Sequence, residues 1–271
     1  MMTERYRRCW PLVFGVIPFA VSYALVVPHA AQADSCVLAT QHAGVAFPVE
    51  KLEDDRACPL KAVIDNYTTA NKLGPLRTPL PEGPYTDLLD RPGLAAALVN
   101  RLGYAPYQAS TRGPQQYWGN DGEGMEGLIE LVYRDRTSRI YILDGSYVGT
   151  WLPRITGRAV VLVRMNPIKE SDGSEAMDTT LVCYTRLNNR VLSGVVSLLR
   201  PLIGSNVTKR LMRVAEAANR LSQEMKKSPD RVLEKALATP PLPEEDIALL
   251  KRMLAELHEP GRLDPKNGAI P

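Results

Sequence analysis

From residue 104 onward, apolar and polar residues alternate along the chain, which is the period of a β-strand. The alternation and the turn sequences between its runs predict six strands, near 106–112, 115–119, 127–134, 139–149, 155–165 and 178–187. Short connections such as Asn120-Asp121-Gly122 favour antiparallel neighbours. We therefore expect one antiparallel meander.

The same alternation predicts that the sheet has one dry face and one wetter face. In the strand 155–165, the apolar face carries Ile155, Ala159, Val161, Val163 and Met165, and the other face carries Thr156, Arg158 and Arg164. The strand 178–187 alternates in the same way. A dry face must be covered, so we expect a helix to pack on it.

Helical spacing precedes the strands. A helix is predicted to open at Pro59 and to stop at Gly74-Pro75, after which a proline-rich, extended connector leads to Tyr85. Two short helices follow: Thr86–Asp90, and a second that Asp90 caps and that ends at Gly103.

The longest helical pattern follows the last strand, from about Asn188 to Lys227, and Pro201 and Gly204 are expected to interrupt it. Its second half carries one apolar stripe, which consists of Val207, Leu211, Val214, Ala218, Leu221 and Met225. This stripe is the predicted cover of the dry face. Two more helical segments run from Ser228-Pro229 to His258.

The first 33 residues have the features of an export signal. Residues 5–8 (Arg-Tyr-Arg-Arg) form a positive region before the apolar run Trp10–Val27, and Ala31 and Ala33 form a small-x-small cleavage site. The prediction is a cleaved, exported protein of the periplasm or cell envelope. The alternative is an uncleaved N-terminal membrane anchor, because the run is long enough to span a bilayer.

These patterns divide the chain into four parts. Residues 1–33 are the signal or anchor, 34–84 an N-terminal helix with its connector, 85–227 the sheet with its covering helix, and 228–271 a C-terminal helical extension. The oligomeric state cannot be predicted from these patterns.

The charge balance and the few cysteines and histidines limit the kinds of binding site that the chain can form. Without the signal, 30 of the 33 basic and 29 of the 30 acidic residues remain, which is too balanced for a nucleic-acid-binding protein. Export permits a Cys36–Cys58 disulfide and leaves Cys183 as a buried thiol. With two histidines left and no CxxC pair, we predict neither a metal site nor a cofactor.

The order of two short helices, meander and long helix is similar to the helix-grip fold of the SRPBCC superfamily, which includes START lipid-transfer domains and polyketide cyclases. The resemblance is carried by YTDLLDRPGLAAALVNRL (85–102), GLIELVYRD (127–135), GRAVVLVRM (157–165), DTTLVCYTRL (178–187) and VTKRLMRVAEAANRLSQEM (207–225). It implies an α+β fold in which a curved antiparallel sheet wraps around a long C-terminal helix. The family also has a strand before the two short helices, so either one is hidden in 36–50 or the sheet lacks an edge.

The resemblance further implies a cavity between sheet and helix that holds an apolar ligand. The candidate lining residues are Ile129, Leu131, Tyr133, Ile140 and Ile142 or their alternates, Val161, Val163, Leu181, Cys183, Leu211, Val214 and Ala218. The candidate rim consists of Tyr117, Trp118, Tyr147, Trp151, Arg154 and Arg158, of which the arginines would pair with an anionic head group. Plain core packing and surface packing are the competing interpretations of both sets.

Three functions fit these patterns. The first is a non-catalytic, exported protein that binds a lipid or other apolar molecule near a membrane. The second is a cyclase-like enzyme that uses a carboxylate or Tyr in the same cavity, although no motif points to catalysis. The third is an envelope interaction module whose partner surface is the helices between 229 and 258.

Overall fold

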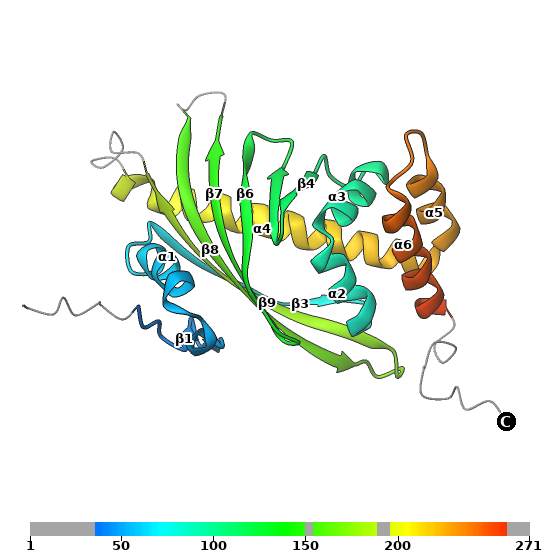
Figure 1. The fold of residues 1–271 in the computed structure, drawn as a ribbon, viewed down its shortest axis with the longest axis horizontal. Helices are drawn as coiled ribbons and strands as arrows, with labels where there is room; N and C mark the ends of the chain where they lie inside the picture. Colours follow the sequence, from blue (N-terminus) through cyan, green and yellow to red (C-terminus); the bar gives the residue numbers. More distant parts are fainter. Residues whose placement is uncertain (1–35, 150–153, 189–195, 259–271) are drawn as a thin grey trace, which may run out of the picture. The chain divides into compact units, whose positions relative to one another are not determined.

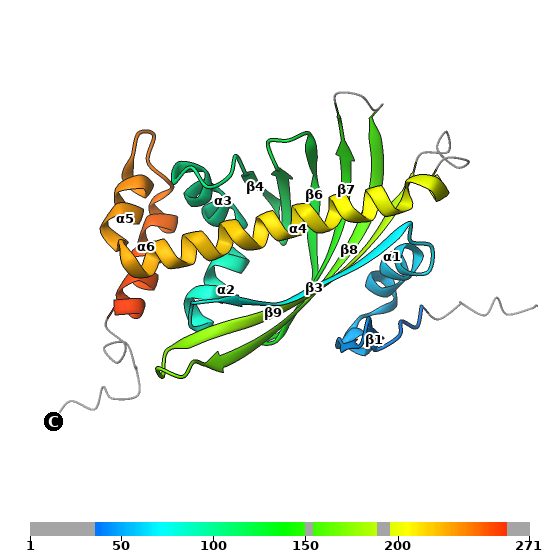
Figure 2. The same ribbon diagram turned by 180° about the vertical axis from the view of Figure 1, so that it is seen from behind.

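A seven-stranded antiparallel sheet curves around the long helix α4, Val196–Lys227 (Figures 1 and 2). The computed structural model describes residues 36–149, 154–188 and 196–258. The export signal, Trp151 and the predicted start of the long helix at Asn188 to 195 therefore fall wholly or largely outside the described residues.

The sheet has the strand order β3-β9-β8-β7-β6-β5-β4. Its strands are β3 (Thr69–Thr78), β4 (Gln108–Gly113), β5 (Gln116–Asn120), β6 (Met125–Arg134), β7 (Ser138–Tyr147), β8 (Ile155–Lys169) and β9 (Glu175–Leu187). Between β3 and β4 lie the short helices α2 (Glu82–Asp90) and α3 (Pro92–Arg101). The predicted α+β helix-grip fold and all six strands of the meander are confirmed.

The edge strand β3 corrects the prediction for the region before the meander. Thr69 pairs with Thr185 and Thr78 with Met177 along β9, so the segment predicted as helix end and connector is an edge strand that precedes the two short helices. Gly74-Pro75 forms a bulge in it, which an edge strand tolerates because one side needs no hydrogen-bonded neighbour. A Cβ at Gly74 would lie 2.5 Å from the carbonyl oxygen of Thr179, so this strand approaches β9 closely.

The helices nearby also start and end elsewhere than predicted. Helix α1 spans Asp54–Ile64, with Pro59 inside it rather than at its start. Asp90 is the last residue of α2 instead of the cap of α3, and its carboxylate pairs with the buried Arg139 of β7 at 3.2 Å. This ion pair explains the position of Asp90, because a buried guanidinium needs a compensating charge.

Helix α4 continues through Pro201 and Gly204, so the predicted interruption is wrong. The amide of Asn71 in β3 donates hydrogen bonds to the Gly204 carbonyl at 3.0 Å and to the Thr208 hydroxyl at 2.8 Å. A Cβ at Gly204 would lie 3.7 Å from the Thr69 side chain. Contacts with β3 therefore support the helix where its own sequence is weakest.

The prediction of one dry and one wet face is wrong for β7, β8 and β9, whose two faces are both apolar. On the outer face, Ile140, Leu162 and Val182 pack against Leu60 and Val63 of α1. The N-terminal segment supplies this cover. It also holds the two-residue strands β1 (Gln41–His42) and β2 (Val45–Ala46), the 3-10 helix η1 (Val49–Lys51), and a Cys36–Cys58 disulfide that joins its start to α1.

The C-terminal helices α5 (Pro229–Leu237) and α6 (Glu244–His258) pack against α3 and the end of α4. Leu250 and Leu254 of α6, one of the helices considered as a partner surface, are buried in this core. The Arg101 guanidinium donates hydrogen bonds to four carbonyl oxygens between Lys235 and Pro240. Among the described residues, no helix combines the length and the hydropathy needed to cross a membrane.

Candidate functional site

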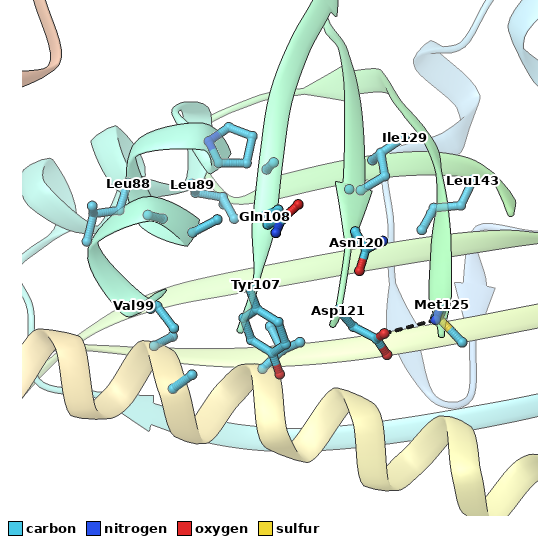
Figure 3. Close-up of a pocket in the computed structure, with 18 of the residues that line it drawn as sticks. Leu88, Leu89, Val99, Tyr107, Gln108, Asn120, Asp121, Met125, Ile129 and Leu143 are labelled. Atoms are coloured by element: carbon cyan, nitrogen blue, oxygen red, sulfur yellow. Dashed lines mark hydrogen bonds between the residues drawn. The ribbon is translucent and has the colours of Figure 1, made fainter. Parts of the chain in front are cut away.

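A cavity of about 440 Å³ lies between the inner face of the sheet, helices α2 and α3, and the second half of α4 (Figure 3). Its walls come from the ends of β4 to β7, from Leu88 and Leu89 of α2, from Val99 of α3 and from Val214 of α4. The volume is within the range of small-molecule sites.

A row of glycines forms the floor of the cavity. Gly119 of β5 pairs with Gly127 of β6, which pairs with Gly145 of β7, which pairs with Gly157 of β8. The first three of these glycines line the cavity. A Cβ at Gly127 would lie 2.5 Å from the Asp144 carbonyl oxygen, closer than real Cβ contacts. Neighbouring strands thus approach each other closely at Gly127, and along the row main chain rather than side chains faces the cavity.

The opposite wall also consists of small residues. Ala95 and Ala96 of α3 and Ala217 and Ala218 of α4 line the cavity. Val214, which also lines it, is 52% exposed although it is apolar. Small side chains on both walls create the volume, and the surface they leave is apolar.

Several polar groups of the cavity wall have hydrogen-bond partners within the protein. The hydroxyls of Tyr85 and Thr179 share a hydrogen bond of 2.7 Å, and burial raises the pKa of Tyr85. Ser222 donates a hydrogen bond to the Ala218 carbonyl at 2.7 Å. No Lys, Arg or His is found among the described lining residues. Nor does the described part of the chain contain a group of three or more His, Cys, Asp and Glu side chains that could hold a metal.

Three acidic residues line the cavity, and each pairs with an arginine. Asp144 accepts a hydrogen bond from Arg158 at 2.8 Å, and Glu126 lies 3.4 Å from Arg154. The third, Asp121, accepts hydrogen bonds from the main-chain N–H groups of Glu123 and Met125 and pairs with Arg210 of α4. Each charged side chain among the described lining residues thus has a counter-charge.

A smaller hollow of about 180 Å³ opens beside the cavity, between α4 and the β5–β6 loop; we call it the vestibule. Tyr107, Asp121, Val214 and Ala217 line both spaces. Figure 3 shows Tyr107 pointing toward α4, at this shared boundary. The charged residues of the vestibule are Asp121, Glu123, Arg210, Arg213, Glu216 and Arg220.

The structure divides the predicted lining residues into three groups. Ile129, Val214 and Ala218 line the cavity. Six more lie away from the cavity, packed on the inner side of the sheet or on α4. They are Leu131, Val161, Val163, Leu181, Cys183 and Leu211. On the outer face, within the core under α1, are Tyr133, Ile140 and Ile142.

The prediction that Tyr133, Ile140 and Ile142 line the cavity is wrong for two physical reasons. A bulge between Leu131 and Tyr133 breaks the alternation of β6, so Tyr133 moves to the other face. In β7 both faces are apolar, and the alternate residue Leu143 lines the cavity in place of Ile140 and Ile142.

The predicted rim residues do not form one ring. The Arg210 guanidinium lies 5.1 Å from the centroid of the Tyr147 ring, close to the vestibule. Tyr117 is opposite Ile129 in β6, whereas Trp118 is opposite Leu128 and has Arg112 at 5.8 Å from its ring centroid. Arg154 bonds Ser146 at 2.9 Å and Arg158 pairs with Asp144, both at the surface, and Trp151 is outside the described residues.

Sequence reasoning missed the glycine row, the alanines of α3 and the vestibule. A glycine inside a strand pattern signals a bend or a close approach, and four of the predicted strands contain one. That signal identifies the glycines one by one. Only the strand register shows that they lie side by side.

No family model matches the sequence, and no curated protein matches it. Solved structures that the chain is similar to include a conserved protein from Geobacillus kaustophilus, at 12% identity and a TM-score of 0.41 over 58% of this chain and 97% of that chain. Another is the di-domain ARO/CYC BexL from the BE-7585A biosynthetic pathway, at 15% identity and a TM-score of 0.39 over 59% and 52%. A third is Ara h 8.0201, at 12% identity and a TM-score of 0.35 over 58% and 97%.

Proposed function

We propose that this protein binds an apolar small molecule, such as a lipid, in the cavity and holds it without chemical change. The observation that carries the proposal is the glycine floor facing an alanine wall, which together keep about 440 Å³ free of side chains. Apolar walls gain free energy when an apolar molecule covers them, roughly 25 cal/mol per Å² removed from water. Binding is therefore favourable without any charged anchor.

The alternative of a cyclase-like enzyme is less well supported by the geometry. A general acid or base needs a titratable group that faces the substrate and is free to exchange a proton. In the cavity wall, Tyr85 is hydrogen-bonded to Thr179, and Asp121, Glu126 and Asp144 each pair with an arginine. Tyr107 also lines the cavity, and burial raises its pKa, which makes it a weaker acid. We therefore favour a carrier over an enzyme.

The test uses a variant that fills the cavity. Ala218 lies on an α4 turn that faces the cavity, so Ala218→Phe should occupy the space without straining the sheet. Ala255→Phe, on an exposed position of α6, is the matched control. We expect the uncharged fluorescent probe N-phenyl-1-naphthylamine to bind the wild type and the control, and to bind Ala218→Phe at least about tenfold more weakly.

Native mass spectrometry of protein purified from its own host complements the probe. Bound lipid should be present in the wild type and lost in Ala218→Phe. Equal probe binding by Ala218→Phe and the wild type would refute the proposed site, and absence of both probe and lipid from the wild type would refute the function.

We further propose that the chain is exported and acts in the periplasm or cell envelope. The N-terminal pattern supports this, and so does the Cys36–Cys58 disulfide, since such bonds persist in oxidising compartments. Sequencing the N-terminus of the native protein should give Asp34 as the first residue. A full-length chain retained in the membrane fraction would support the anchor instead, and a full-length chain in the cytoplasm would exclude export.

A further inference from the structure

We propose that the vestibule is the head-group site for the ligand of the cavity and that it takes a zwitterionic head, one that carries a phosphate and an ammonium with no net charge. This inference rests on the proposed function, because it assumes that the apolar part of the same molecule fills the cavity. It adds the class of ligand: a zwitterionic amphiphile.

Continuity of the two spaces is the first argument. Four residues line both the cavity and the vestibule, and Tyr107 and Val214 are two of them. A molecule that extends from one space into the other passes from apolar walls to charged walls at this boundary. The polarity of the protein thus changes along one path as it does along an amphiphile.

The charges of the vestibule are the second argument. The described lining of the vestibule has three arginines and three carboxylates, which form the pairs Arg210–Asp121, Arg213–Glu123 and, along α4, Arg220–Glu216. A head with a net negative charge would meet a carboxylate beside every guanidinium, and a net positive head would meet the reverse. A zwitterion can place its phosphate on a guanidinium and its ammonium on the neighbouring carboxylate, which exchanges one internal ion pair for two with the ligand.

The three pairs differ in how freely they can exchange. Asp121 is held by two main-chain N–H groups and its pair with Arg210 is mostly buried, so this pair fixes the β5–β6 loop to α4. Arg213 and Glu123 are about half exposed, and Glu123 lies on the loop. Arg213–Glu123 is therefore the pair that the head group would open.

The test compares three single-chain lipids with the same acyl chain, measured as monomers by competition with N-phenyl-1-naphthylamine. They are a lysophosphatidylethanolamine (zwitterionic), a lysophosphatidic acid (anionic) and a monoacylglycerol (uncharged). We expect the zwitterion to bind about tenfold more tightly than either of the others. Equal binding of all three lipids, or tightest binding of the anion or of the monoacylglycerol, would overturn the inference and leave the apolar carrier function standing. Failure of the naphthylamine probe itself to bind would overturn the proposed function as well.

A double variant locates the effect. Arg213→Gln with Glu123→Gln removes both charges of one pair at once, so no charge is left without a partner. The readout is the ratio of zwitterion to monoacylglycerol affinity, which cancels any general change in the fold. We expect this ratio to fall from about tenfold to below about threefold. The control pair Arg252–Asp87, at 2.9 Å between α6 and α2, should leave the ratio unchanged when replaced by Gln and Asn. An unchanged ratio in the Arg213/Glu123 variant would overturn the assignment of the head to the vestibule.

Discussion

The two faces of the sheet differ in how they are filled. On the outer face of β7, β8 and β9, large side chains interlock with α1, and Ile140, Leu162 and Leu60 are fully buried. On the inner face of β5, β6 and β7, glycines face the alanines of α3 and α4 across a cavity of about 440 Å³. Because packing density sets the cost of a substitution, the outer face should carry stability and the inner face should carry binding.

The largest expected effect compares one residue from each face. Leu60→Ala should lower the free energy of unfolding by about 2–5 kcal/mol, because it opens a hole in a closed core. Val214→Ala should change it by less than about 0.5 kcal/mol, since Val214 is 52% exposed. Denaturant unfolding measures both. Equal losses in the two variants would show that the faces do not divide these roles.

The disulfide on the outer side gives the next effect. Replacing Cys36 and Cys58 together by Ser should destabilise the fold by about 3 kcal/mol, because the bond closes a loop of 22 residues. Probe binding in the cavity should persist at temperatures where the variant is folded. Loss of binding in a folded variant would mean that the N-terminal segment shapes the inner face as well.

Two glycines of the floor sharpen the comparison on the inner face. Gly127→Ala should cost about 1–3 kcal/mol, because its Cβ would meet the Asp144 carbonyl oxygen at 2.5 Å. Gly119→Ala should cost less than about 1 kcal/mol, because its Cβ would meet the movable end of Ile129 at 3.3 Å. Thermal unfolding tests the order, and a larger loss in Gly119→Ala would contradict the close approach of the strands at Gly127.

The smallest effect is a dependence of stability on pH. Burial lowers the pKa of His42 on the outer side, where its Nδ1 lies 3.1 Å from the Tyr184 hydroxyl. The unfolded chain therefore binds a proton near pH 6.5 that the folded chain binds only at lower pH. Stability should be complete above about pH 6.5 and should fall as the pH drops below it. His42→Asn should flatten this slope in unfolding experiments between pH 7.5 and 5, and an unchanged slope would assign the dependence to other groups.

The meander and the covering helix follow from the sequence because each depends on local periodicity and on turn residues. Which face a strand residue takes is harder to predict. In β8 the run Val160, Val161, Leu162 and Val163 is apolar at every position, so the sequence does not show which of these side chains face inward. Strand β3 was hidden for another reason: Gly74-Pro75 is a strong break signal, and pairing with β9 overrides it.

The cavity is only partly predictable. Val214 and Ala218 follow from the helical stripe, because helical spacing alone places them on one side of α4. The floor does not follow, since Gly119, Gly127 and Gly145 are separated along the chain and meet only through pairing. The vestibule likewise depends on how the loop around Asp121 approaches α4, which no local pattern encodes.

The glycine row has a consequence for how such a protein can change its cargo. At Gly127 and Gly157 an added Cβ would lie 2.5 and 2.7 Å from a carbonyl oxygen of the neighbouring strand, so these two positions cannot be enlarged without moving the sheet. Ala95, Ala96 and Ala218 sit on helices and are under no such constraint. Evolution or engineering could therefore adapt the binding site to a shorter or bulkier ligand by substitutions on the helices, while the strands keep their sequence.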